Sequence, residues 1–307
     1  MLRHIRLILR RYITPRQKTF LKKQISSFKR LSIYVYLSRC VFKIRKKFVV
    51  LFLSYTSAQL ERKLRSMGLS EGDTVFMHSS FNALNGFKNE PQQVVDCLLN
   101  IISTSGNLLM VSMPYEGFTS EYLRQKKPFD PVKTPSSMGI LTEIFRRQKG
   151  VMRSLNPAHP ILAFGPRAEW LIADHDKTMY SCGKGSPFEK ALKLNAKAFF
   201  FDTSFRSMSF CHYLEDHYKE NLSGKLYNDE PVEGRVINTD GSETKLMIYV
   251  FSDEATKRRS FRVLEREMLK HNLMKVDKIG NTKLILVHLA DVADCAQKLV
   301  KSGKHLW

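Results

Sequence analysis

Residues 73–81, DTVFMHSSF, predict a short buried strand that ends in small polar side chains. Thr74 to Met77 is rich in β-branched and aromatic residues, and Gly72-Asp73 supplies a turn before it. His78-Ser79-Ser80 follows, and a helix is predicted to open near Glu90-Pro91. This order places backbone N–H groups and hydroxyls where an anionic or carbonyl-rich ligand can bind. Taken alone, the stretch also fits an ordinary loop, so both interpretations stay open.

Strand and helix patterns alternate along the chain beyond residue 56. A helix is predicted over Ser57–Met67, ended by Gly68, and another runs from Glu90-Pro91 to Gly106. The βαβ order indicates an α/β domain. Further buried strands, a hairpin and a last helix are predicted at Leu108–Val111, Ile161–Phe164, Lys197–Phe201, Val236–Tyr249, Leu284–Leu289 and Ala290–Lys301.

The segment after the second strand carries two local predictions. Tyr115–Val132 predicts an irregular loop. Thr134–Gly139 predicts the start of a helix that runs to about Lys149, with Ser136 or Ser137 as its N-cap. These serines either cap the helix or present its N-terminus to a phosphate or carbonyl oxygen.

The positive charge is concentrated at the N-terminus. The chain carries 50 Lys and Arg against 29 Asp and Glu, a net charge of +21. Residues 1–60 hold 15 of the basic residues and no acidic one, which leaves the remainder near +6. The sequence therefore predicts a basic amphipathic arm over residues 1–56 and an α/β domain over residues 57–307.

The apolar runs within the arm are too short to span a bilayer. Leu7-Ile8-Leu9 is shorter than the core of a signal peptide, and the uncharged run Phe48–Leu60 has 13 residues where a span needs about 20. Three roles stay open: packing on its own domain or a partner, lying on an anionic membrane surface, or binding nucleic acid. Nucleic acid is the least favoured, because no reader motif is present.

The five cysteines are scattered, odd in number and without a C-x-x-C pair. This pattern argues against a disulfide framework or a cysteine-based zinc site and favours a reducing cytoplasm. No other metal motif is visible, so the sequence predicts no metal.

A second polar constellation occurs in a predicted helix over residues 207–216. His212 and Glu215 stand at positions i and i+3, on one face. Such a pair is either an ordinary surface pair or a base oriented by a carboxylate. Cys211 adjoins His212, but neighbouring helix positions point about 100° apart, which disfavours a thiol nucleophile.

Taken together, residues 57–302 resemble the aminoglycoside 3-N-acetyltransferase family, which transfers acetyl from acetyl-CoA to an amine. The basic arm lies outside the resemblance. The resemblance rests on Gly72–Ser80, Pro128–Pro131, Thr134–Gly139, Arg153-Ser154 with Asn156-Pro157, Gly165–Glu169, Gly185–Pro187, His212-x-x-Glu215, Ile279–Asn281 and Asp291–Asp294.

The resemblance implies an α/β fold with a central mixed sheet flanked by helices. It implies acetyl-CoA as acyl donor, His212 as the general base with Glu215 beside it, and direct transfer without an acyl-enzyme. A base is needed because a protonated amine cannot attack a thioester. The residues that the resemblance assigns to CoA are His78, Ser79, Ser80, Gly86, Thr134, Ser136, Ser137, Met138 and Gly139, with Arg153 as a phosphate or packing partner.

The chain departs from the family pattern at two places. Asn156 stands where the family commonly has His, with His159 nearby as a substitute, and residues 202–208, DTSFRSM, replace a Gly-rich segment bearing Asp or Asn. The domain charge near +6 and Arg206 favour an anionic acceptor over a polycationic drug. An amino sugar on a nucleotide or lipid carrier fits, as does surface-polysaccharide assembly at the inner membrane face.

Two functions from different classes follow. The first is an acetyl-CoA-dependent N-acetyltransferase acting on an amino sugar or aminoglycoside-like amine. The alternative is a catalytically remodelled relative that binds a glycan or a partner through the same cleft. The sequence predicts nothing about the oligomeric state.

Overall fold

The computed structural model describes residues 32–306, and Leu7-Ile8-Leu9 lies outside the described residues. The chain divides into two units between Phe52 and Leu53, whereas the sequence placed the boundary after residue 56. The described part of the first unit is a single helix, α3 (Ser32–Phe52).

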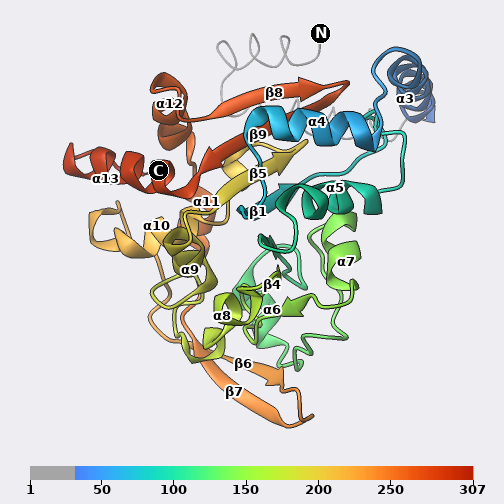
Figure 1. Ribbon diagram of the computed structural model, residues 1–307. Helices are drawn as coiled ribbons and strands as arrows, with labels where there is room; N and C mark the ends of the chain where they lie inside the picture. Colours follow the sequence, from blue (N-terminus) through green and yellow to red (C-terminus); the bar gives the residue numbers. More distant parts are fainter. Residues whose placement is uncertain (1–31, 307) are drawn as a thin grey trace. The chain divides into compact units, whose positions relative to one another are not determined.

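A seven-stranded mixed sheet forms the centre of the second unit (Figure 1). Its order is β3-β4-β2-β1-β5-β9-β8, in which β1 runs parallel to β2 and β5 and the other neighbours are antiparallel. The mixed α/β fold expected from the resemblance is thus confirmed. The strands are β1 (Thr74–Ser79), β2 (Asn107–Val111), β3 (Met152–Arg153), β4 (Ile161–Phe164), β5 (Lys197–Phe201), β8 (Lys275–Ile279) and β9 (Thr282–His288).

Successive residues of β1 pack on opposite faces of the sheet, as strand geometry requires. Val75 and Met77 join one buried cluster, and Phe76 joins the other. Helices cover both faces, so the central strands are buried on each side (Figure 1). The first cluster includes residues of α4 (Ser57–Met67), α5 (Gln92–Ile102) and α7 (Ile140–Arg146). The second includes residues of α8 (Ala168–Ile172), α9 (Pro187–Lys193), α10 (Cys211–His217), α12 (Arg262–Lys270) and α13 (Leu289–Lys301).

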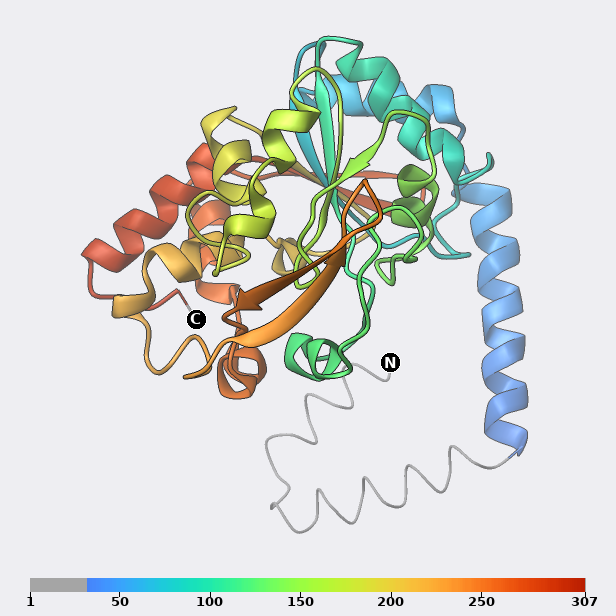
Figure 2. The ribbon, with the colours of Figure 1, turned by 90° about the horizontal axis from the view of Figure 1, so that it is seen from below.

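A separate hairpin, β6 (Val232–Ile237) and β7 (Glu243–Ile248), lies alongside α6 (Thr119–Arg124) (Figure 2). It has its own small core, in which Val236 and Ile248 accompany Leu123 and Phe129. Phe129 bridges to the hairpin through backbone hydrogen bonds to Arg235 and Ile237. The remaining short elements are α11 (Asp253–Arg258) and the 3-10 turns η1 (His175–Lys177), η2 (Phe205–Ser207) and η3 (Lys219–Asn221).

Several predicted helices and strands are confirmed. The helix Ser57–Met67 ends at Gly68, which has a left-handed backbone with φ of 108°. The strands at 108–111, 161–164 and 197–201 and the hairpin are present. The described residues contain no helix whose length and apolarity would let it cross a bilayer. All five cysteines are free thiols.

Two local predictions are wrong. The segment Tyr115–Val132, predicted as an irregular loop, contains the helix α6, which packs against β6. The predicted N-cap at Ser136 or Ser137 is also wrong, because α7 begins at Ile140 with Gly139 as its N-cap and ends at Arg146. The Ser136 hydroxyl instead accepts a hydrogen bond from the Met138 N–H at 3.2 Å, which keeps the segment in a turn.

Candidate active site

The short helix α10 carries His212 and Glu215 on one side. Cys211, Tyr213 and Leu214 of the same helix are buried in the core, which fixes the rotation of the helix. His212 Nδ1 lies 2.8 Å from Glu215 Oε2. The His212 side chain is 19% exposed, whereas Glu215 has no exposed side-chain surface. The predicted i, i+3 pair therefore exists, and it faces inward rather than toward solvent.

Arg259 completes this cluster from a distant part of the chain. Its Nε donates to both carboxylate oxygens of Glu215, at 2.8 Å and 3.0 Å. The guanidinium carbon lies 4.5 Å from the centre of the Phe251 ring. Nη2 is buried and has no hydrogen-bond partner among the described residues. The buried carboxylate of Glu215 is thus paired with the permanent positive charge of Arg259.

The cluster sets the protonation of its members. Burial lowers the pKa of His212, and the Arg259 charge lowers it further against the opposing effect of Glu215. Burial alone would raise the pKa of Glu215, but His212 and Arg259 outweigh it and hold that pKa below its usual range. At neutral pH the imidazole is therefore neutral and the carboxylate is ionised. Nδ1–H donates to Glu215, which leaves the Nε2 lone pair free to accept a proton.

His212 opens onto a cavity of about 350 Å³. Met138, from the Thr134–Gly139 turn, lines the same cavity, so the structure brings together residues from two of the predicted motifs. The lining residues are Met113, Tyr115, Glu116, Gly117, Phe118, Thr119, Met138, His159, His212, Phe251, Thr256 and Arg259.

Asn156 shapes a turn that brings His159 to this cavity. Its Oδ1 accepts from the N–H groups of Ala158 and His159, at 3.0 Å and 3.1 Å, and its Nδ2 donates to the His175 carbonyl. His159 Nδ1 lies 2.7 Å from Ser181 Oγ. Burial, with the charge of His212 next, holds the pKa of His159 well below its ordinary value, so this ring is neutral. Asn156, which stands where the family commonly has a histidine, therefore has a structural role.

His78 lies at the carboxyl end of β1, where ligands bind in open α/β sheets. Its ring stacks between Phe76 and Phe200, with centroid separations of 5.3 Å and 4.9 Å. Burial, with a smaller contribution from His212, lowers the pKa of His78 to about 3. Nε2 is buried and has no hydrogen-bond partner among the described residues.

The other residues near β1 that the resemblance assigns to CoA, Ser79, Ser80 and Gly86, lie in two different places. Ser79 and Ser80 extend β1 alongside Phe201, and Ser80 is exposed. Gly86 lies in the segment that pairs with Tyr55, and its carbonyl accepts from the Tyr55 N–H at 3.0 Å. None of these three residues lines the cavity.

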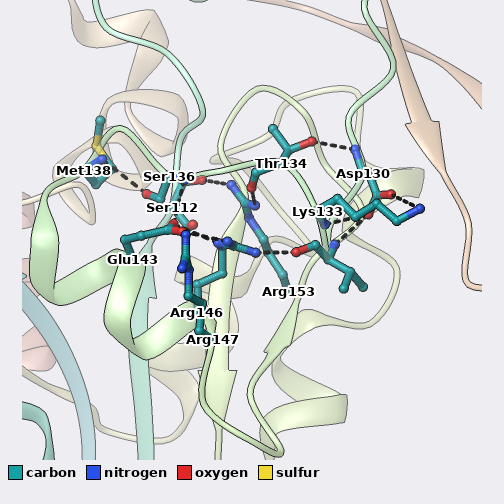
Figure 3. A network of polar contacts seen from close by, with 11 residues as sticks. Ser112, Asp130, Lys133, Thr134, Ser136, Met138, Glu143, Arg146, Arg147 and Arg153 are labelled. Carbon is teal, nitrogen blue, oxygen red and sulfur yellow. Dashed lines mark hydrogen bonds and ion pairs between the residues drawn. The ribbon is translucent and has the colours of Figure 1, made fainter. Parts of the chain in front are cut away.

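Internal hydrogen bonds hold the Thr134–Gly139 turn (Figure 3). Thr134 Oγ1 accepts from the Asp130 N–H at 2.9 Å, and the Ser136 N–H donates to Glu143 Oε2 at 3.0 Å. Ser137 donates its N–H to the Met113 carbonyl, while its side chain faces solvent. The hydroxyls of Thr134 and Ser136 therefore shape the turn, and Ser137 has the hydroxyl that remains available.

Arg153 anchors the turn from beneath (Figure 3). Its guanidinium donates to the carbonyls of Thr134, at 2.5 Å, and Ser112, and it lies 4.6 Å from the Phe129 ring centre. Arg153 is 7% exposed. Of the two roles that the sequence left open, these contacts favour packing over phosphate binding.

The segment 202–208 does not form a basic wall at the cavity. Phe205 and Met208 are buried in the core, and Arg206 pairs loosely with Glu265, with 3.8 Å between Nε and Oε2. The arginine that lines the cavity is Arg259. The sequence analysis missed it, because it occurs in the basic run Lys257-Arg258-Arg259, which has the pattern of an exposed helix end.

The chain belongs to the aminoglycoside 3-N-acetyltransferase family, whose model matches residues 76–301. Aminoglycoside N(3)-acetyltransferase III of Acinetobacter baumannii is 27% identical over 173 residues, which cover 52% of this chain and 60% of that protein. The chain thus spans well under two thirds of that relative's length in the match.

Two solved structures share the fold at low identity. AAC-IIIb in a binary complex with CoASH superposes with a TM-score of 0.69 at 21% identity, covering 82% of this chain and 98% of that chain. AAC-VIa with sisomicin bound gives a TM-score of 0.67 at 20% identity, covering 81% and 98%.

Proposed function

We propose that the protein is an acetyl-CoA-dependent N-acetyltransferase that acts on an amino group of an amino sugar or aminoglycoside-like acceptor. One observation carries the proposal: His212, oriented through its Nδ1 by a buried carboxylate, lines a cavity that Met138 of the Thr134–Gly139 turn also lines. A neutral, oriented imidazole at the wall of a cavity is what general-base catalysis requires.

The proposed reaction is direct transfer. Acetyl-CoA supplies a thioester carbonyl carbon for attack. His212 Nε2 removes one proton from the acceptor ammonium, and the amine nitrogen bonds to the carbonyl carbon. The carbon–sulfur bond breaks, and the nitrogen releases its second proton to solvent as the amide forms. His212 then returns the proton to the departing thiolate. Glu215 keeps Nδ1–H engaged, so that the imidazolium formed in between is stabilised by an adjacent carboxylate.

CoA binding is proposed at the Thr134–Gly139 turn and the His78–Ser80 segment. The turn has an exposed Ser137 hydroxyl and an exposed Gly139, and His78 Nε2 is a buried polar atom without a partner. These features suit a ligand rich in carbonyl and phosphate oxygens. The CoASH bound to AAC-IIIb supports this choice of donor. Gly86 has the weakest structural support, because its carbonyl is engaged by Tyr55.

The acceptor we favour carries an amine and is not a polycation. Among the described residues that line the cavity, Glu116 supplies the only carboxylate. A site for a polycationic drug is expected to present several carboxylates. Sisomicin bound to AAC-VIa supports an aminoglycoside as the competing choice. A nucleotide- or carrier-linked amino sugar of surface-polysaccharide synthesis is the finer proposal.

Thiol release from acetyl-CoA tests the acceptor class. Nucleotide-linked amino sugars are compared with sisomicin and kanamycin-type amines at equal concentration, with His212→Ala as the blank. We expect the nucleotide-linked amines to give the higher kcat/KM. A higher kcat/KM for the aminoglycosides would overturn the acceptor proposal and leave the N-acetyltransferase proposal standing.

The alternative is a remodelled relative that binds a glycan or partner without catalysis. It is supported by the departures at Asn156 and residues 202–208. The intact His212–Glu215 pair speaks against it. Binding of acetyl-CoA without release of CoA for any amine would favour this alternative.

We further propose that α3 lies on an anionic membrane surface. One side of the helix carries the exposed apolar residues Leu37, Val41, Ile44, Phe48 and Leu51, spaced three and four apart. The opposite side carries Arg39, Lys43 and Lys46, with Arg45 and Lys47 at the two edges, and residues 32–52 contain no acidic residue. This pattern fits an amphipathic helix at a bilayer surface on the cytoplasmic side.

Sedimentation with vesicles tests the proposed binding of α3 to a membrane surface. We expect the full chain to bind vesicles containing phosphatidylglycerol and not pure phosphatidylcholine. Val41→Glu with Ile44→Glu should abolish binding and leave acetyl transfer intact. Equal binding by this double variant would contradict the proposed apolar contact.

A further inference from the structure

Arg259 reaches the candidate base from outside the motifs that identify the family. It follows the last residue of α11, 44 positions after Glu215. Its side chain is 13% exposed, and its Nε bonds both oxygens of a carboxylate that has no exposed surface. The Phe251 ring lies against the guanidinium, 4.5 Å from its carbon to the ring centre.

Glu215 needs this partner in order to stay ionised. Burying a lone carboxylate costs several kcal/mol unless it is paired and hydrogen-bonded. His212 supplies a hydrogen bond, but as a neutral ring it supplies no counter-charge. Arg259 supplies a permanent charge, because a guanidinium does not lose its proton in proteins.

We propose that Arg259 is a positioning residue of the active site, which keeps Glu215 ionised and thereby holds the His212 ring with Nε2 toward the cavity. The proposal rests on the proposed N-acetyltransferase function. Arg259 acts through Glu215, so it is expected to change the proton affinity and orientation of the base rather than the binding of acetyl-CoA.

The charges around His212 determine the direction in which its titration should shift when Arg259 is removed. His212 is faced by Glu215 from α10, Arg259 after α11, His159 before β4 and His78 at the end of β1. Arg259 carries the only permanent positive charge in this group. Removing it favours the first proton taken up by the His212–Glu215 pair, whichever residue holds that proton. The acid limb of the rate profile must therefore move to higher pH.

The test compares Arg259→Gln and Arg259→Lys with Arg258→Gln as the matched control. Arg258 is the neighbouring arginine, is 47% exposed and pairs with Glu254. Nitrogen NMR follows the His212 titration, assigned by its loss in His212→Asn, and thermal melting confirms folding. In parallel, kcat and the KM for acetyl-CoA are measured against pH.

We expect Arg259→Gln to raise the titration midpoint of the pair by about one pH unit, because removal of a charge 4–6 Å away has that size of effect. The kcat near neutral pH should fall about 10–100-fold, with the acetyl-CoA KM within about twofold. Arg259→Lys should keep the wild-type midpoint, and Arg258→Gln should match wild type. An unchanged or lower midpoint in folded Arg259→Gln would overturn the proposal.

A double-mutant cycle covers the case in which Arg259→Gln fails to fold. It combines Arg259→Lys with Glu215→Gln. Arg259→Lys keeps the charge, and with it the midpoint, but loses the Nε that bonds both oxygens of Glu215 and orients the pair. The proposal therefore requires that Arg259→Lys lowers kcat in the wild-type background and has less than about a twofold effect once Glu215 is Gln. Equal losses in both backgrounds would contradict it. If wild type acetylates no amine, the proposed function fails, while the His212 titration still tests Arg259.

Discussion

His159 and His212 lie together in the wall of one cavity, with ring centroids 6.1 Å apart and ring planes inclined at 58°. Only His212 has a carboxylate partner, because His159 Nδ1 faces the Ser181 hydroxyl. The difference in partners assigns the two neutral rings different roles. It also separates His212, the proposed base, from His159, the residue near Asn156 that could substitute for the family's histidine.

His212→Ala should abolish transfer and preserve donor binding. General-base catalysis contributes about 10²–10⁴-fold, so kcat should fall by that factor. Acetyl-CoA at about 100 times its Kd should still stabilise the variant by about 2.7 kcal/mol, as measured by thermal melting. If acetyl-CoA does not shift the melting temperature of the wild type, the binding-protein alternative is favoured.

His159→Gln should be far milder than the change at His212. A glutamine can keep the hydrogen bond to Ser181, and the proposed base is untouched. We expect kcat to stay within about tenfold of wild type, below the range for loss of a general base. A deeper loss, measured by thiol release under the same conditions, would mean that His159 takes part in proton transfer.

Gly139→Ala should weaken donor binding through backbone strain. Gly139 has φ of 98° and ψ of 173°, and an added Cβ would meet nothing within 4 Å. Such a conformation costs a non-glycine residue about 1–3 kcal/mol. We expect a higher acetyl-CoA Kd by calorimetry. Gly241→Ala, also at positive φ in open space, is the control for stability alone and should leave the Kd unchanged.

Arg153→Met should destabilise the domain and the turn together. It removes two hydrogen bonds from a buried guanidinium and leaves the Thr134 and Ser112 carbonyls without that donor. Hydrogen bonds from charged groups contribute about 1.5–3 kcal/mol each, so a loss of about 3 kcal/mol is expected in urea unfolding. Arg147→Met, in which the side chain is 69% exposed, should change stability by less than about 1 kcal/mol.

Stability should decrease as the pH falls below about 6.5, the ordinary pKa of histidine. Burial lowers the pKa of His175 to about 4 and that of His78 to about 3. Between the folded and unfolded values the unfolded chain binds more protons, so acid favours unfolding. Each such histidine contributes a slope of about 1.4 kcal/mol per pH unit.

Urea unfolding at pH 7 and pH 5.5 measures this slope. The range avoids most carboxylate titration, because ordinary Asp and Glu pKa values lie near 4. His175→Asn should reduce the slope by one histidine's share. A stability that is flat over this range would show that the buried histidines accept protons within the folded state.

Local sequence patterns determined most of the fold. The β-branched and aromatic residues of the segment 74–77 identified a buried strand, and Gly68 marked a helix end. The three-residue spacing of His212 and Glu215 identified the pair that the helix brings together. These features could be predicted because strand and helix periods are properties of a few adjacent residues.

The tertiary structure alone decided which side chains complete the site. Arg259 meets Glu215 from 44 residues away, and the Asn156 amide turns His159 toward the cavity. Serine 136, predicted to cap a helix, instead bonds within its own turn. No local pattern encodes such contacts, because they arise where distant segments pack and buried polar groups find whichever partners are in reach.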